Sequence, residues 1–403
     1  MLFSLAMIIL AGLSAAAICE KIGLPRIIGM LGVGIAVSPY VLDLIAPSIL
    51  GISSELRQIA LIIILIKAGL SLNLSDLKKV GRPAVMMSFV PACFEIVGYV
   101  VFAPVLLDIS RTEAAVMGAV LSAVSPAVVV PRMVRLIEEK YGTEKSIPQM
   151  ILAGASCDDI FVIVLFSTFV TMAQGGSASA LDLLNIPVSV LLGVLLGAAV
   201  GFVLYLLFET SCQHQHTIRN STKVLIMLGT AFLLMAIETF VKPYAAVSGL
   251  LAVVAMACMI KLKADQNVSA RLSEKFGKLW IAAEIILFVL VGAAVDIRYT
   301  LTAGAAALLM ILLALIFRAA GVLLCLCGTK LTAKERIFCV IAYLPKATVQ
   351  AAIGSIPLSL GLPCGQIILS VAVLAILITA PIGAIGIDRS YRRLLVHECS
   401  AVQ

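Results

Sequence analysis

Two adjacent carboxylates, Asp158 and Asp159, lie within an apolar stretch of this 403-residue sequence. Gly154 and Ser156 precede them, and residues 160–169 are almost wholly apolar. Two neighbouring acids in a medium of low dielectric constant cannot both stay ionised at low cost, so we expect at least one to hold a proton near working pH. A dehydrated, ionised carboxylate is also a hard oxygen ligand for a small cation. The pair therefore predicts a site at which H⁺ and an alkali cation compete.

Neighbouring side chains on a helix point about 100° apart, so the two aspartates are not expected to share one partner. We expect one to face a cation cavity and the other to face a basic residue. Arg318 and Glu95 are also ionisable groups deep within apolar stretches, at corresponding positions in the two halves of the chain. Because a lone buried charge is costly, we expect this acid and base to meet. Arg318 then pairs with Glu95, with Asp158 or with both, and the sequence does not rank these alternatives.

The composition indicates a protein that lies mostly in lipid. Hydrophobic residues make up 62% of the chain and charged residues 13%, and the mean hydropathy is +1.15. Soluble globular domains carry about 25% charged residues, so most of this chain is expected to face a bilayer. The hydrophilic stretches are too short for a separate catalytic or nucleotide-binding domain, and the sequence contains no HExxH motif. We therefore expect a transporter, not an enzyme, with no cofactor.

The sequence divides into apolar segments of about 20 residues, the length that a helix needs to cross a bilayer. We predict an all-α polytopic membrane protein with about 13 transmembrane helices. The first begins at Met1 without a basic region or a convincing cleavage site, so we expect a retained helix and not a signal peptide. The predicted spans are Leu2–Cys19, Ile27–Ile45, Leu56–Leu72, Pro83–Leu107, Thr112–Leu136, Pro148–Met172, Ile186–Phe208, Thr222–Val241, Tyr244–Leu262, Phe276–Val295, Leu301–Cys327, Lys334–Ile356 and Pro363–Ile387.

The distribution of Lys and Arg residues among the predicted loops indicates the orientation. Of the 29 such residues, 22 fall on the side of the C-terminal tail, four on the opposite side and three within spans. Cytoplasmic loops are enriched in Lys and Arg, so we place the C-terminus in the cytoplasm of a bacterial inner membrane that the chain crosses many times. The same asymmetry explains the net charge of +7, so we expect membrane lipids and no nucleic acid as partners.

Weak internal similarity between the two halves of the chain predicts two copies of a six-helix unit. Gly69 matches Gly292, and Gly29 lies opposite Gly249. Seven helices separate corresponding members, so we expect the second copy to be inverted, as in many secondary transporters. The single membrane unit of residues 1–403 is then divided into a first repeat (1–172), a linker helix (173–221), a second inverted repeat (222–387) and a cytoplasmic tail (388–403).

Proline and small polar residues interrupt one apolar segment in each predicted repeat. Proline frees a backbone carbonyl on the preceding turn, and irregular backbone at membrane depth is tolerated only where protein or a wet cavity covers it. Because both members of the pair show this feature, we predict two discontinuous helices instead of simple proline kinks. The residues that mark them are Pro126 and Pro131 in the first segment, and Pro345, Lys346, Thr348 and Gln350 in the second.

Several stretches match a known family when they are taken together. They are Gly23–Leu31, Ala68–Leu72, Ser125–Pro131, Cys157–Asp159 and Leu344–Ala352. The combination resembles the monovalent cation/proton antiporters of the CPA superfamily, and the last stretch is most similar to the NHA branch of animal Na⁺(Li⁺)/H⁺ exchangers and their bacterial relatives. The similarity covers essentially the whole chain. It implies a homodimer of thirteen-helix subunits, each with a dimerisation domain and a mobile core domain that moves as an elevator.

The resemblance also implies roles for individual residues. Asp159 would be the main cation and proton ligand, and Asp158 its partner carboxylate. Ser125 and Ser156 would be auxiliary oxygen donors. The discontinuous helices would cross as unwound segments beside the aspartates.

Glu95 and Arg318 match an acid and arginine pair of the NHA branch. The electrogenic relatives carry a lysine where Arg318 stands. A buried lysine can release its proton and an arginine cannot, so any second proton must come from Asp158 or Glu95. The stoichiometry therefore stays open.

Our leading hypothesis is the exchange of Na⁺ or Li⁺ for H⁺ by alternating access, in the service of pH homeostasis. The alternative is a sodium-coupled symporter of a small organic anion, which would need a roomier amphipathic cavity and further sodium ligands. The acidic pair argues against that alternative. A channel would need a continuous polar pore instead of two broken helices. The sequence does not decide among Na⁺, Li⁺ and K⁺.

Overall fold

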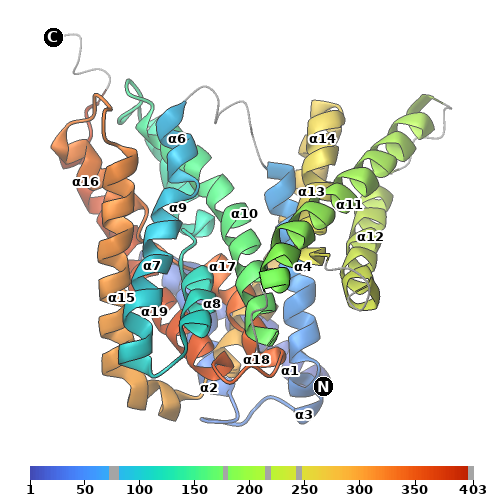
Figure 1. Ribbon diagram of the computed structural model, residues 1–403, viewed down its shortest axis with the longest axis horizontal. Helices are drawn as coiled ribbons and strands as arrows, with labels where there is room; N and C mark the ends of the chain where they lie inside the picture. Colours follow the sequence, from blue (N-terminus) through green and yellow to red (C-terminus); the bar gives the residue numbers. More distant parts are fainter. Residues whose placement is uncertain (72–80, 176–179, 214–218, 242–246, 398–403) are drawn as a thin grey trace. The chain divides into compact units, whose positions relative to one another are not determined.

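The computed structural model describes residues 1–71, 81–175, 180–213, 219–241 and 247–397. The regular elements in these ranges are helices (Figure 1), apart from a bridge between Tyr141 and His397. Nine helical segments within the described ranges are long and apolar enough to cross a bilayer. The chain is therefore an all-helical polytopic membrane protein. The predicted total of about 13 spans includes shorter helices and stays a prediction.

The described helices belong to two compact units that alternate along the chain. Unit 1 takes in Met1–Ser54, Asn73–Val162 and Ile285–Gln403, and unit 2 takes in Glu55–Leu72 and Ile163–Glu284. The aspartate pair, Glu95, Arg318 and both proline-containing segments fall within unit 1. The candidate site is therefore contained in unit 1. The predicted repeat boundaries, near residues 172 and 222, are defined on a different basis and stay a prediction.

Unit 1 is built around a buried apolar core. Met87, Val129, Ile151, Val322 and Phe338 contribute to it from five helices, and each of these side chains is fully buried. α7 (Val90–Leu107) packs along α15 (Ile297–Cys325), and α16 (Ala333–Ala342) and α17 (Thr348–Gly354) pack against α19 (Gly365–Leu394) (Figure 1). The unit contains the first part of α10 (Ile147–Gln174), the last part of α14 (Gln266–Ala293), and α1 (Leu2–Lys21), α2 (Arg26–Val37), α3 (Pro47–Gly51), α6 (Arg82–Met87), α7 (Val90–Leu107), α8 (Arg111–Leu121), α9 (Pro126–Glu138), α15 (Ile297–Cys325), α16 (Ala333–Ala342), α17 (Thr348–Gly354), α18 (Ile356–Ser359) and α19 (Gly365–Leu394).

Unit 2 contains a close helix pair formed by small residues. Gly193, Gly197 and Gly201 are spaced four residues apart on α11 (Ala180–Gln213). A Cβ atom at any of them would lie within 2.6 Å of a backbone carbonyl oxygen of α13 (Gly249–Lys263) or of its N-cap residue, Ser248. Helices in lipid associate through such small-residue faces because their backbones approach closely there. The helices of this unit are nearly all of α4 (Ser53–Ser71), the remaining parts of α10 and α14, and α11 (Ala180–Gln213), α12 (Asn220–Val241) and α13 (Gly249–Lys263).

Two unwound segments interrupt unit 1 where the sequence predicts broken helices. Residues 122–125 separate α8 from α9, and residues 343–347 separate α16 from α17. Pro126 is the first residue of α9, where its missing N–H breaks no helical hydrogen bond. Ser125 has the extended conformation that a following proline favours. In the second segment, Pro345 disfavours helical geometry at the residue before it.

Pro131 lies inside α9, the second half of the first interrupted segment, and does not itself mark the break. α9 continues through Pro131 to Glu138. A proline inside a helix removes one backbone donor, and α9 nevertheless continues on both sides of Pro131. The loss is therefore local, and the break lies upstream, at residues 122–125.

The two helices that precede the breaks begin with the same capping box. Ser110 and Glu113 exchange backbone-to-side-chain hydrogen bonds of 2.8 and 3.2 Å at the start of α8. Thr332 and Glu335 do the same, at 2.7 and 3.4 Å, at the start of α16. Such boxes satisfy two of the free backbone donors at a helix N-terminus. The two boxes occupy corresponding positions in the two predicted repeats.

Candidate cation and proton site

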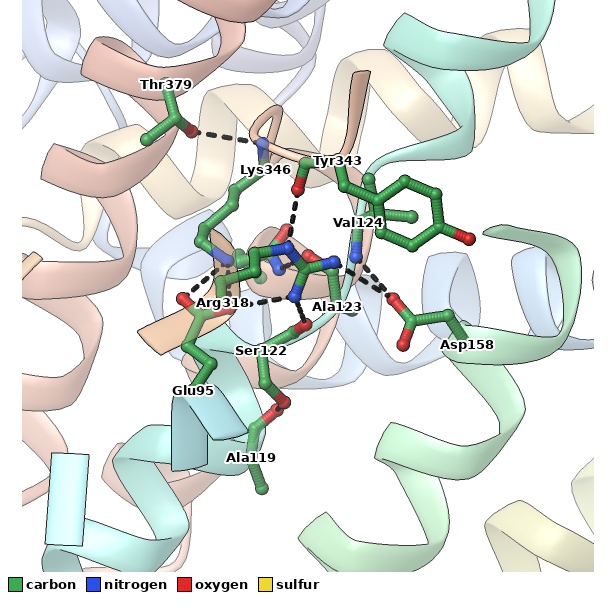
Figure 2. Close-up of polar contacts among 11 residues, drawn as sticks. Glu95, Ala119, Ser122, Ala123, Val124, Asp158, Arg318, Tyr343, Lys346 and Thr379 are labelled. Carbon is green, nitrogen blue, oxygen red and sulfur yellow. Dashed lines mark hydrogen bonds and ion pairs between the residues drawn. The ribbon is translucent and has the colours of Figure 1, made fainter. Parts of the chain in front are cut away.

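Arg318 of α15 is a fully buried guanidinium group that contacts two buried acids. Its Nη1 donates to Oε2 of Glu95 in α7 at 2.8 Å, and its Nη2 donates to Oδ2 of Asp158 in α10 at 3.5 Å (Figure 2). The acid and base at corresponding positions in the two halves of the sequence are therefore in direct contact. Of the alternatives that the sequence leaves open, the structure has Arg318 paired with both acids, and more closely with Glu95.

Arg318 also joins the ends of the two helices that precede the breaks. Its Nη1 donates to the carbonyl oxygen of Ser122, and its Nε donates to that of Tyr343. These residues are the C-caps of α8 and α16, where unpaired carbonyls carry a partial negative charge. The guanidinium carbon also lies 5.5 Å from the centre of the Tyr343 ring. An arginine can make these contacts together because it has five donors in a planar fork.

The first unwound segment forms hydrogen bonds with the second unwound segment and with α17, which follows it. The N–H of Ser125 donates to the carbonyl oxygen of Pro345 at 2.8 Å, and Nε2 of Gln350 donates to that of Ala123 at 2.8 Å. Backbone groups at membrane depth need such partners because lipid supplies none. Pro345 also lies against α19, where a Cβ atom at Gly383 would come within 2.3 Å of its ring. Contacts on both sides therefore hold the second segment in place.

Lys346 is a second buried cation beside Glu95. Its Nζ lies 2.7 Å from Oε1 and 2.8 Å from Oε2 of that carboxylate, and its N–H donates to Oγ1 of Thr379 at 3.0 Å. Figure 2 shows Glu95 between Lys346 and Arg318. The sequence identifies Lys346 as part of a broken helix but does not reveal its partner. The two residues are far apart in the chain, so no local pattern signals this pairing.

The two adjacent aspartates have different surroundings. Oδ2 of Asp158 accepts a hydrogen bond from the N–H of Val124 at 2.7 Å, in addition to its contact with Arg318. Asp159 is 7% exposed, and its buried Oδ1 has no hydrogen-bond partner among the residues that the structure describes. This difference agrees with the expectation that neighbouring positions on a helix face different partners. Asp158 is bound by Val124 and Arg318, whereas Oδ1 of Asp159 remains free to accept a hydrogen bond.

Other oxygens near the breaks are also available as ligands. Oδ1 of Asp158, Oγ of Ser125 and Oγ1 of Thr348 are buried and have no hydrogen-bond partner within the described ranges. Carboxylate and neutral oxygens are the ligands that hard cations prefer. The side chain of Ser156, a predicted auxiliary donor, lies outside the described residues. The described part of the chain therefore contains both charged and neutral buried oxygens without hydrogen-bond partners near the breaks.

The formal charges of the site leave one carboxylate uncompensated. Glu95, Asp158 and Asp159 are acids, and Arg318 and Lys346 are bases. Both bases contact Glu95, and Arg318 reaches Asp158, whereas the described ion pairs do not include Asp159. A buried charge without a partner is costly. One proton or one monovalent cation at Asp159 would neutralise the site.

A buried acid–base centre beside two discontinuous helices is characteristic of secondary membrane transporters. Comparison with known proteins identifies the family within this class. The chain belongs to the family described as sodium/hydrogen exchanger, transmembrane, whose model matches residues 5–389. This membership confirms the resemblance to the monovalent cation/proton antiporters of the CPA superfamily.

Individual relatives agree with this assignment. The chain is 34% identical over 360 residues to sodium/hydrogen exchanger 9B2 of Pongo abelii, covering 85% of this chain and 64% of that protein. It is 32% identical over 381 residues to sodium/hydrogen exchanger 9B1 of Homo sapiens, covering 90% of this chain and 71% of that protein. The chain thus spans slightly less than two thirds of the first relative. The solved sodium proton antiporter MjNhaP1 of Methanocaldococcus jannaschii shares the fold, with a TM-score of 0.82 over 97% of both chains at 21% identity.

Proposed function

We propose that this protein is a secondary transporter that exchanges Na⁺ or Li⁺ for H⁺ across a membrane, with Asp159 binding the two cations in turn. One observation carries the proposal: Asp159 is a buried carboxylate with a free oxygen, next to an Asp158 that is already held by Arg318 and Val124. The names of the relatives, which are sodium/hydrogen exchangers, support the choice of cargo.

In this mechanism, protonated Asp159 gives up its proton when a dehydrated cation enters. Asp158, through its free Oδ1, and Ser125, through Oγ, are the proposed further ligands. Arg318 and Lys346 keep their charges and hold Glu95 and the unwound segments in position. Because proton and cation occupy the same carboxylate, binding of one releases the other. Exposure of the site to each side in turn converts this competition into exchange.

We extend the proposal to the organisation of the protein. It comprises about 13 spans in two inverted repeats, it acts as a homodimer by an elevator movement, and its C-terminus faces the cytoplasm of a bacterial inner membrane. The matching capping boxes of α8 and α16, at corresponding positions in the two repeats, support this division. The Lys and Arg distribution supports the orientation. Exchange in this arrangement would serve pH homeostasis.

Proton movement in liposomes tests the proposed function. The purified protein is reconstituted, a pH gradient is imposed, and its dissipation is followed with a fluorescent dye after separate additions of Na⁺, Li⁺, K⁺ and an organic anion with Na⁺. We expect Na⁺ or Li⁺ to dissipate the gradient and protein-free liposomes to show no response. Sodium-driven accumulation of the organic anion without proton movement would instead support the symporter and contradict the proposal.

We further predict that the exchange is electroneutral, one proton for one cation. Arg318 keeps its proton, and the ammonium group of Lys346 is held by both oxygens of Glu95. We propose that Asp158 and Glu95, which are paired with these bases, also keep their charge states, so that Asp159 alone changes its own. The rate of Na⁺-driven proton movement should be the same when valinomycin and K⁺ clamp the membrane potential at zero or at an inside-negative value. A rate that depends on this potential would show that a second site group releases a proton.

A further inference from the structure

A groove of about 510 Å³ runs along one face of α19 beside α16, within unit 1. Ile341 of α16 lines one part of it, together with Ile382 and Ile385 of α19. Arg389 and Arg393 line the part nearer the C-terminal end of α19. The groove therefore changes from apolar to basic along the helix.

The residues of α19 in the groove follow the helical period. Ile382, Ile385, Arg389 and Arg393 are three or four positions apart and so share one face. At 1.5 Å per residue, the distance along the axis from Ile382 to Arg393 is about 16 Å. Ile382 is 57% exposed, although it lies between Thr379 and Gly383, which contact the second unwound segment. The groove therefore lies on an exposed face of α19, and another face of the same helix contacts the second unwound segment.

Two small residues, Gly386 and Ser390, also line the groove. At Gly386 a Cβ atom would lie 2.8 Å from Cγ2 of Ile341, so a larger side chain would fill the space between the helices. At the basic end, Oγ of Ser390 is buried and has no hydrogen-bond partner in the described part of the chain.

The two arginines of the groove lack acidic partners among the described residues. The nearby acid Asp388 is bound by Arg132 at 3.1 Å and by Arg135 at 2.8 Å, from α9. Like charges four residues apart on a helix destabilise it by a few tenths of a kcal/mol per pair. An anion between Arg389 and Arg393 would remove this repulsion. Guanidinium groups bind phosphate in two-pronged geometry.

We propose that this groove binds one anionic phospholipid. Its phosphate lies between Arg389 and Arg393, and an acyl chain lies along Ile382 and Ile385. The order of apolar and basic residues matches the order of acyl chain and headgroup in a phospholipid, and a free phosphate ion would leave the apolar part uncovered. Basic pockets between transmembrane helices commonly bind anionic headgroups on the cytoplasmic side. Membrane orientation alone would account for basic residues at this helix end, but not for the groove or the free Ser390 hydroxyl.

Thermal stability in detergent tests the proposal with the full chain. Phosphatidylglycerol is expected to raise the unfolding temperature of the wild-type protein by several degrees, whereas phosphatidylcholine and inorganic phosphate alone leave it unchanged. The double variant Arg389→Gln/Arg393→Gln should lose the shift. The matched control Lys330→Gln/Lys334→Gln, which removes two exposed lysines outside the groove, should retain it. Equal shifts with the two lipids, a shift with phosphate alone, or an unaltered shift in the arginine variant would each overturn the proposal.

A second measurement does not depend on the variants. Phosphatidylglycerol with a photoactivatable acyl chain is added to the wild-type protein, illuminated, and the modified peptides are identified by mass spectrometry. Labelling is expected on α19 around Ile382 and Ile385, and excess unlabelled phosphatidylglycerol should compete for it where phosphatidylcholine does not. Labelling confined to other helices would overturn the proposal even if the arginine variant fails to fold. Neither outcome depends on ion exchange, so the proposed function is tested separately.

Discussion

The substitution Asp159→Asn is expected to abolish the release of protons that Na⁺ induces from the purified protein. An amide has nearly the shape of the carboxylate but carries no exchangeable charge at neutral pH, so it can neither hold the transported proton nor neutralise a cation. Na⁺-induced proton release should fall below detection, and ion flux in liposomes should be lost as well. The fold should survive, because the substitution removes a buried charge for which the described residues supply no ion pair. A pH-sensitive dye in weakly buffered detergent solution measures the release.

A matched acid outside the site provides the control for this experiment. Glu113 is a structural carboxylate that accepts a hydrogen bond from the N–H of Ser110 at 2.8 Å in the capping box of α8. The variant Glu113→Gln retains an acceptor for this bond and should release protons as the wild-type protein does. Persistence of Na⁺-induced release in a folded Asp159→Asn protein would remove Asp159 from its proposed role.

The substitution Arg318→Ala is expected to lower stability sharply and to eliminate transport. It leaves the carboxylate of Asp158 without its basic partner, and it removes one of the two basic partners of Glu95. It also removes the donor from the carbonyl groups of Ser122 and Tyr343, at the ends of two helices. Breaking a buried ion pair by removal of one partner costs about 3–5 kcal/mol. Thermal unfolding of the purified protein should show a fall of many degrees, and exchange in liposomes should be lost.

Two further variants show whether the effect comes from burial and geometry. Arg271→Ala removes an exposed arginine of α14 and should leave the unfolding temperature and exchange unchanged. Arg318→Lys keeps the positive charge but replaces the planar fork with a single ammonium group. We expect an intermediate unfolding temperature for it, because one ammonium cannot reach both helix ends and both acids together. Wild-type stability and full exchange in Arg318→Ala would contradict the buried pairing.

Arg318 gives the site a structural property that charge alone does not supply. The broken helices end at Ser122 and Tyr343, which are far apart in the sequence, yet one guanidinium group binds both carbonyls. The N–H of Ser125 and the carbonyl of Pro345 join the same two segments directly. A displacement of either segment therefore strains its contacts with the other. The unwound segments are expected to move together with the helices that carry Arg318 and Asp158.

Sequence patterns singled out the ionisable residues of the candidate site and one of their contacts. The aspartate pair stood out because intramembrane acids are costly and therefore rare. The contact between Glu95 and Arg318 followed from the displacement of the internal similarity together with the cost of a lone buried charge. The capping boxes that begin α8 and α16 were visible as Ser or Thr three residues before Glu. Their corresponding positions in the two halves are a further signal for the predicted repeat.

Other features depend on distances between residues, which the types of the side chains do not reveal. Pro131 looked like Pro126 in the sequence, but its position inside α9 makes it a local perturbation instead of a helix start. Lys346 had several possible acidic partners, and the fold places Glu95 against it. The bonds from Arg318 to backbone carbonyls could not be foreseen, because every residue carries a carbonyl and only the fold leaves particular ones unpaired.

The sequence by itself determined that the chain lies in a membrane and that two helices are interrupted near proline, and it singled out an acid pair and a distant arginine as the candidate site. These conclusions follow from the solvation free energies of residue types and from the fixed geometry of the peptide backbone, both of which can be read along one chain. Only the tertiary structure decided which aspartate the arginine engages and which keeps a free oxygen. The reason is physical: adjacent carboxylates are chemically identical, and they become different only when packing places a donor beside one of them.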